Sequence, residues 1–180
     1  DMDTRVSVYE AIRDGKYEVS PPHTAKIPKD DGSYRTVYVN EPQDRVVLGI
    51  VNDLLFDTCP DMVHEACRSY LRGIGTGMVV QNLSRRITSV KPDASGFVGF
   101  KADLSKYFDS VPLELIDGAF DKVEERNGKS AIVDMLRRYY RDGRYYDENG
   151  ILCEKFQSLK QGCSVSSFLA DVMLYDIDDA

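Results

Sequence analysis

A turn signal near the start of the chain argues against an all-helical fold. Asp30-Asp31-Gly32 lies between two short extended runs, and the second run, residues 35–39, is rich in β-branched and aromatic residues. This pattern is typical of a β-hairpin, because glycine supplies the positive φ of a tight turn. The sequence therefore predicts a basic hairpin over about 25–40.

Helical patterns come before and after this hairpin. Apolar residues recur at helical spacing over several stretches. The expected helices cover residues 5–18, the stretches on either side of Pro60, Val79–Ile87, 113–126, 130–142 and the segment from Ser166 onward. A second hairpin is expected with its turn at 147–150, and an apolar run at Phe97–Phe100 predicts a buried strand that leads to Asp103. This order of elements predicts an α+β fold with helices packed on short antiparallel strands.

The composition indicates a folded domain and excludes several classes of protein. The chain has 180 residues, of which 42% are hydrophobic, and no apolar run approaches the roughly 18 residues of a membrane span. Its four cysteines lack CxxC spacing and its two histidines are isolated, which favours reduced thiols and a cytoplasmic protein over a Cys-His metal site. A net charge of -7 argues against nucleic-acid binding over the whole surface, although a local basic patch can still bind it.

Three stretches carry residues suited to chemistry. Asp103, followed five residues later by Phe108, suits a Mg²⁺ ligand beside an aromatic ring that packs under a sugar. Gln161-Gly162 comes before a helix and is either a plain turn or a surface pressed against a nucleotide. Lys29 and Arg35 flank the first hairpin turn, and such a pair is either solvated or holds a triphosphate.

Four blocks, in this order, resemble the reverse transcriptases, closest in style to those of group II introns and related bacterial retroelements. IPKDDGSYR with EPQDRVVLGIVNDLL resembles the first fingers block, and SYLRGIGTGMVVQNL the second. FKADLSKYFDSVP is similar to the first catalytic palm motif, and KQGCSVSSFLADVMLYDID to the next one. The sequence departs from the family pattern at Lys160 and Ser167, where proline is usual, and at Asp171, where asparagine is common.

The resemblance implies fingers over 1–95 and the first part of the palm over 96–180, ending before the Tyr-x-Asp-Asp hairpin of the family. It implies that Asp103 and the backbone carbonyl of Leu104 bind metal, and that Phe108 selects the sugar. The implied nucleotide-binding residues are Lys29, Arg35, Phe108, Gln161 and Gly162. Arg72 is the implied template contact. Arg137 and Arg141 are further candidates for template contact, because arginines and tyrosines alternate in this stretch of the sequence. The same pattern fits equally well an amphipathic helix with tyrosines in the core and arginines in solvent.

The implied activity is RNA-directed DNA synthesis. A primer 3′-hydroxyl would attack the α-phosphate of a deoxynucleotide, with two Mg²⁺ ions at the reacting oxygens and an RNA template and a DNA or RNA primer as partners. We expect the isolated chain to be inactive and the acids of 171–179 to be the solvated face of a helix. The alternatives are an RNA-dependent RNA polymerase, which usually has a small or polar residue in place of Phe108, and a non-catalytic relative that binds nucleic acid or serves in defence.

Overall fold

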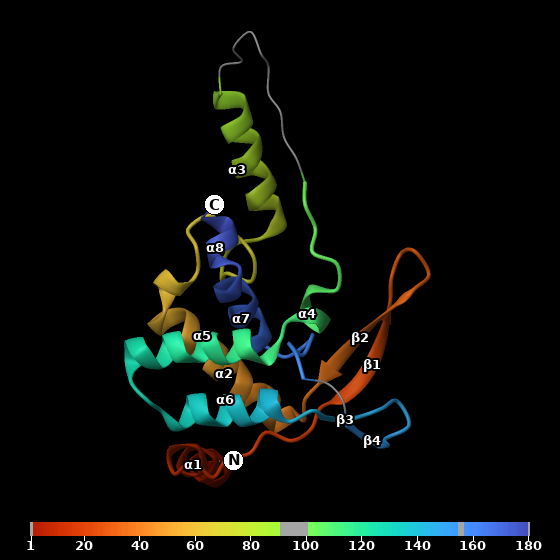
Figure 1. Cartoon of the computed structure of the whole chain (residues 1–180), viewed down its shortest axis with the longest axis vertical. Coiled ribbons are helices and arrows are strands. Elements are labelled where there is room, and N and C mark those ends of the chain that lie inside the picture. Colours follow the sequence, from red (N-terminus) through yellow and green to blue (C-terminus); the bar gives the residue numbers. More distant parts are fainter. Residues whose placement is uncertain (1, 91–100, 155–156, 180) are drawn as a thin grey trace.

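Helices and one small sheet make up the structure, a computed structural model that describes residues 2–90, 101–154 and 157–179 (Figure 1). The helices are α1 (Met2–Arg13), α2 (Pro42–Thr58), a 3-10 turn (Pro60–Met62), α3 (Thr76–Ser89), α4 (Tyr107–Ser110), α5 (Leu113–Asn127), α6 (Ala131–Arg141), α7 (Val165–Met173) and α8 (Tyr175–Asp178). The strands are β1 (His23–Pro28), β2 (Tyr34–Val39), β3 (Arg144–Tyr146) and β4 (Leu152–Glu154). The predicted α+β class is confirmed. None of the described helices is both long and apolar enough to cross a membrane.

The two predicted hairpins form, and they join into one sheet. β1 pairs with β2 and β3 pairs with β4, both antiparallel, and the strand order is β2-β1-β3-β4. The two hairpins meet where β1 runs parallel to β3, with His23 opposite Tyr146. The expectation of antiparallel strands alone is therefore corrected to a mixed sheet. Its parallel junction links segments more than a hundred residues apart, so no local signal could reveal it.

The core lies where α2, α5, α6 and α7 pack together. α5 buries Ile116, Ala119, Phe120 and Val123, which is the i, i+3, i+4, i+7 spacing of one helix face. α7 contacts both α2 and α5 and is buried on nearly all sides. A helix buried on so many sides belongs in the interior, and α7 is therefore the central element of the fold.

Two predicted elements differ in extent and one cannot be compared. The first helix ends at Arg13 instead of residue 18, because Gly15 takes a φ of 69° and the amides of Lys16 and Tyr17 donate back to the carbonyl of Ala11. After Pro60 the chain forms only a short 3-10 turn. The strand expected at 97–100 lies outside the described residues, and the segment 101–104 that follows has no regular structure.

The acids at the C-terminal end divide into two kinds. Asp176, Asp178 and Asp179 are exposed, as predicted for a solvated helix face. For Asp171 that prediction is wrong, since its residue is only 3% exposed and its Oδ2 has no hydrogen-bond partner in the described part of the chain. Burial raises the pKa of the Asp171 carboxyl to about 7, although a hydrogen bond with Cys67 acts in the opposite direction.

We predict that Asp171→Asn removes part of the pH dependence of unfolding. Because the fold raises this pKa from 3.8 to about 7, the folded chain holds the proton more tightly than the unfolded chain. Stability is therefore lost as the pH rises from about 4 to about 7, and a neutral amide avoids that loss. In urea titrations the free energy of unfolding of the variant should be higher than that of wild type by roughly 2 kcal/mol at about pH 8. At about pH 4.5 the two free energies should differ little.

The exposed Asp176→Asn is the matched control and should leave the curve unchanged at both pH values. Equal differences between Asp171→Asn and wild type at the two pH values would contradict a raised pKa at this position.

Candidate functional site

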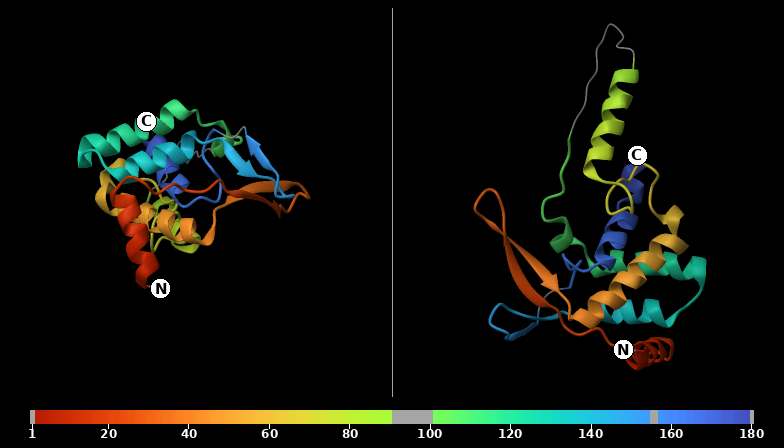
Figure 2. Two further views of the ribbon diagram at one scale, coloured as in Figure 1. Left: turned by 90° about the horizontal axis from the view of Figure 1, so that it is seen from below. Right: turned by 180° about the vertical axis from the view of Figure 1, so that it is seen from behind.

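A cavity of about 940 Å³ opens between the β1–β2 hairpin, the segment 101–109 and the turn at Gln161. Figure 2 shows the hairpin and the segment before α4 rising side by side from the helical body. Six residues singled out in the sequence line this one cavity: Lys29, Arg35, Asp103, Leu104, Phe108 and Gln161. They come from three stretches far apart in the sequence, so their meeting follows from the fold.

The hairpin supplies two of the three cationic side chains that line the cavity, and the third is Lys106 in the segment 101–109. Lys29 begins the turn, where its amide donates to the carbonyl of Ser33 at 2.8 Å, and Arg35 lies in β2 opposite Ile27. On the same hairpin Lys26 is neutralised by Glu148 at 2.6 Å. Lys29 and Arg35 form no such salt bridge within the residues that the structure describes, so both charges can meet an anionic ligand.

The segment 101–109 supplies the carboxylate and the aromatic ring. Asp103 and Leu104 are exposed, whereas Phe108 is half-buried in the short helix α4. This helix is anchored from below, because the Tyr107 hydroxyl donates to the carbonyl of Ala170 at 3.0 Å and Ser158 Oγ donates to the carbonyl of Phe108 at 2.7 Å. The core therefore holds the ring of Phe108 at the cavity wall.

The turn at 160–163 forms the opposite wall and touches β2 directly. The Tyr38 amide donates to the carbonyl of Gln161 at 2.7 Å. Gly162 has a φ of +106°, and a Cβ at this position would lie 2.8 Å from the carbonyl oxygen of Tyr38. Gly162 thus packs against β2 behind Gln161, and its predicted contact with the nucleotide stays a prediction.

Gly162→Ala should therefore destabilise the protein. The new methyl group would collide with the Tyr38 carbonyl, and alanine tolerates this positive φ poorly. We expect a loss of about 2 kcal/mol in the free energy of unfolding, measured by urea titration. Gly118→Ala in α5 is the matched control, since nothing lies within 4 Å of its Cβ position and alanine favours a helix. If Gly118→Ala lowered the free energy of unfolding by as much, the close contact at Gly162 would not explain the loss.

The described residues of the cavity do not form a complete site for two metal ions. Asp103, Asp109 and Asp178 all line it, and Asp103 with the Leu104 carbonyl offers the oxygen ligands that Mg²⁺ prefers. No three metal-binding side chains converge anywhere in the described ranges 2–90, 101–154 and 157–179. The two Mg²⁺ ions therefore stay a prediction.

The three arginines considered for template contact all form salt bridges within the protein. Arg72 pairs with Asp53, outside the cavity. Arg137 joins α6 to α5 through Asp117, Asp121 and Glu124, and Arg141 also reaches Asp117 at 2.9 Å. The neighbouring Tyr139 and Tyr140 are buried, as the amphipathic-helix interpretation expects. Template contact by Arg72, Arg137 and Arg141 stays a prediction.

Sequence reasoning missed one residue behind the cavity wall, Lys160. It was noted only for standing where the resembling family has proline, yet its side chain is fully buried. Burial lowers the pKa of the Lys160 ammonium to about 8. The departure from the family pattern was the one signal that could have drawn attention to it.

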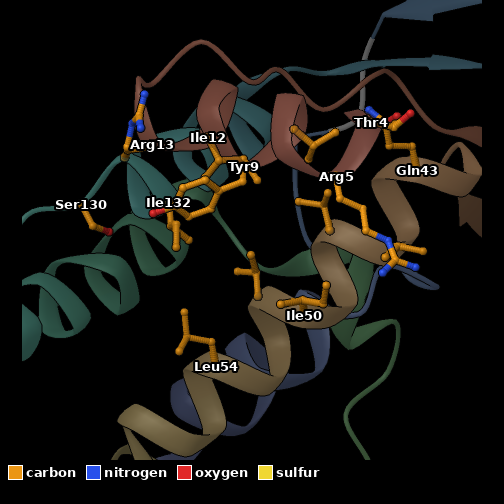
Figure 3. A pocket seen from close by; sticks show the side chains of 15 residues that line it. Thr4, Arg5, Tyr9, Ile12, Arg13, Gln43, Ile50, Leu54, Ser130 and Ile132 are labelled. Carbon is orange, nitrogen blue, oxygen red and sulfur yellow. The ribbon is translucent and has the colours of Figure 1, made fainter. Parts of the chain in front are cut away.

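A second cavity, of about 1030 Å³, lies between α1, α2 and the start of α6 (Figure 3). Its wall is mainly apolar, with Tyr9, Ile50, Leu54 and Ile132 facing the space. Arg5 and Arg13 also line this second cavity, but most of its other lining residues are apolar and none is a carboxylate. The cavity beside the hairpin combines three cations with three carboxylates. The smaller but more polar cavity is therefore the better candidate for a nucleotide.

No family model matches the sequence. Two curated proteins of Saccharomyces cerevisiae are similar to it. The first, named "Putative COX1/OXI3 intron 1 protein", is 24% identical over 165 residues, which is 92% of this chain and 19% of the yeast protein. The corresponding intron 2 protein is 23% identical over 168 residues, or 93% of this chain and 18% of its own length. The chain thus spans about a fifth of the length of these distant relatives.

Proposed function

We propose that this chain forms the fingers and the first part of the palm of an RNA-directed DNA polymerase of the group II intron or retroelement type. The observation that carries the proposal is the cavity in which Lys29, Arg35 and Asp103 meet Phe108 and Gln161. The similarity to two intron proteins, which extends over almost the whole chain, supports the retroelement origin. The division into fingers (1–95) and palm (96–180) is part of the same proposal.

The cavity suits a nucleoside triphosphate because both cations and carboxylates line it. Lys29 and Arg35 on the hairpin would bind the triphosphate, with a forked guanidinium beside a point charge. Asp103 and the Leu104 carbonyl, which line the same cavity, would supply part of the coordination of Mg²⁺, which stabilises the attacking and leaving oxygens in phosphoryl transfer. Binding a triphosphate between cations and a carboxylate orients it for attack by a primer hydroxyl.

Phe108 favours deoxynucleotides over ribonucleotides. Its ring is half-buried, lines the cavity and is held by the anchored helix α4. A fixed aromatic ring beneath the sugar leaves no room for a 2′-hydroxyl, whereas a small side chain would. This feature supports a DNA polymerase over the alternative of an RNA-dependent RNA polymerase.

The first test is nucleotide binding by the chain itself. A fluorescently labelled dATP with Mg²⁺ should bind, and Arg35→Ala should raise its Kd by about tenfold, the cost of one charge-assisted hydrogen bond. Lys26→Ala is the matched control, because it removes a positive charge from the same hairpin outside the cavity. Equal effects of the two variants would mean that the hairpin attracts nucleotides only by its general charge.

The second test separates chemistry from selection in the parent protein. Asp103→Ala should abolish primer extension on an RNA template without changing the melting temperature, because an exposed ligand is lost but no core contact. Phe108→Ala should retain extension but incorporate ribonucleotides, which competition between dNTPs and rNTPs would measure. Normal extension by Asp103→Ala, or unchanged sugar selection by Phe108→Ala, would refute the respective role.

A further inference from the structure

Lys160 is a buried cation with a full set of partners. Its Nζ donates hydrogen bonds to the carbonyls of Tyr139 at 2.7 Å and Asp142 at 3.1 Å. The same atom lies 4.2 Å from the ring centre of Tyr139 and 5.4 Å from that of Tyr140. An ammonium group has three donors, and two carbonyls with an aromatic face use all of them. Because a buried charge is costly without such partners, this arrangement fixes where Lys160 can lie.

The two carbonyls belong to the carboxyl end of α6. The last carbonyls of a helix lack partners within the helix and carry the negative end of its dipole, so they suit a cation. Lys160 therefore ties the turn 160–163 to the end of α6. The turn itself is closed by the Cys163 amide, which donates to the carbonyl of Lys160 at 3.0 Å.

Contacts next to Lys160 also reach the β1–β2 hairpin, which carries Lys29 and Arg35. Gln161, the next residue, accepts the amide hydrogen of Tyr38 in β2. Tyr139, which lies against Lys160, exchanges hydrogen bonds of 2.9 and 3.1 Å with Asn40, the residue that follows β2. The end of β2 is thus held from two sides, and both contacts involve a residue that lies next to the same buried ammonium.

We propose that Lys160 is a positioning residue of the candidate site, holding the turn 160–163 against β2 so that Gln161 lines the same cavity as Lys29 and Arg35. The inference rests on the proposed nucleotide site and goes beyond it, because Lys160 itself is fully buried and does not line the cavity. A variant without the Lys160 ammonium would have a loosened cavity wall, although every residue that lines the cavity would be unchanged.

The test is Lys160→Met, which keeps a long side chain and removes the charge. The Kd for labelled dATP with Mg²⁺ should rise at least about threefold, since a displaced wall weakens every contact made across it. The backbone amide of Tyr38 should exchange with solvent at least about tenfold faster, since its acceptor is no longer held. Val123→Ala, a core truncation in α5, is the control for lost stability alone and should leave the Tyr38 amide and the Kd near wild-type values.

A pH profile separates positioning from mere packing. The titratable groups around Lys160 are the Asp142 carboxylate, the Cys163 thiol in its own turn, and Tyr139 and Tyr140, whose rings lie against its ammonium. The pKa of Asp142 is lowered by Arg144, and burial raises the pKa values of both tyrosines well above 10, so those three groups keep their charge states between about pH 7.5 and 9.5. The pKa of Lys160 is about 8, so wild-type affinity should fall over this range, while Lys160→Met stays flat.

Wild-type affinity together with wild-type protection of the Tyr38 amide in Lys160→Met would overturn the inference. If wild type binds no nucleotide, the proposed nucleotide site fails, and the Tyr38 amide in the variant still decides whether Lys160 holds the turn. If Lys160→Met does not fold, the test is made on the wild-type protein alone. The hydrogen-exchange protection factor of the Tyr38 amide, corrected for intrinsic exchange, should then fall with rising pH when it is divided by the protection factor of the Leu136 amide. A constant ratio would overturn the inference.

Discussion

The candidate site depends on a contact between two backbones. The turn at 160–163 approaches β2 so closely that the Gly162 position has no room for a side chain beside the Tyr38 carbonyl. The adjacent hydrogen bond from the Tyr38 amide to Gln161 fixes the spacing. This junction places a hairpin that begins near residue 23 beside a turn that forms almost 140 residues later, and the cavity lies between them and the segment 101–109.

The core and the site are built from the same elements. α7, which follows the turn directly, is buried against α2 and α5, so the turn starts from a fixed point. The anchoring of α4 through the Ala170 carbonyl makes α7 a support for the Phe108 wall as well. A single central helix thus positions two walls of the cavity, and the hairpin forms the third. The site therefore rests on the core through α7.

Local chemistry in the sequence predicted the local elements. The two hairpins form at their turn signals, and α5 begins directly after Pro112 as expected. What depends on tertiary packing could not be predicted. The pairing of β1 with β3 joins distant segments, and the burial of Lys160 and Asp171 contradicts the usual preference of charged residues for solvent. The residues of the cavity were chosen one by one from motif resemblance, and only the fold could show that six of them share one space.

The way in which the hairpin joins the sheet has a mechanical consequence. Among the described residues, the strand pairing between this hairpin and β3 is the single pair His23–Tyr146, whose rings stack 4.8 Å apart. The Thr24 hydroxyl also donates to the Tyr146 carbonyl and Lys26 pairs with Glu148, so the contacts with the β3–β4 hairpin lie in the basal part of β1. Six strand residues span about 20 Å, so a rotation of about 5° at that base carries the far end by about 2 Å. Lys29 and Arg35 lie near that end and would move together. A small rigid-body rotation of the hairpin about its base would therefore widen or narrow the cavity.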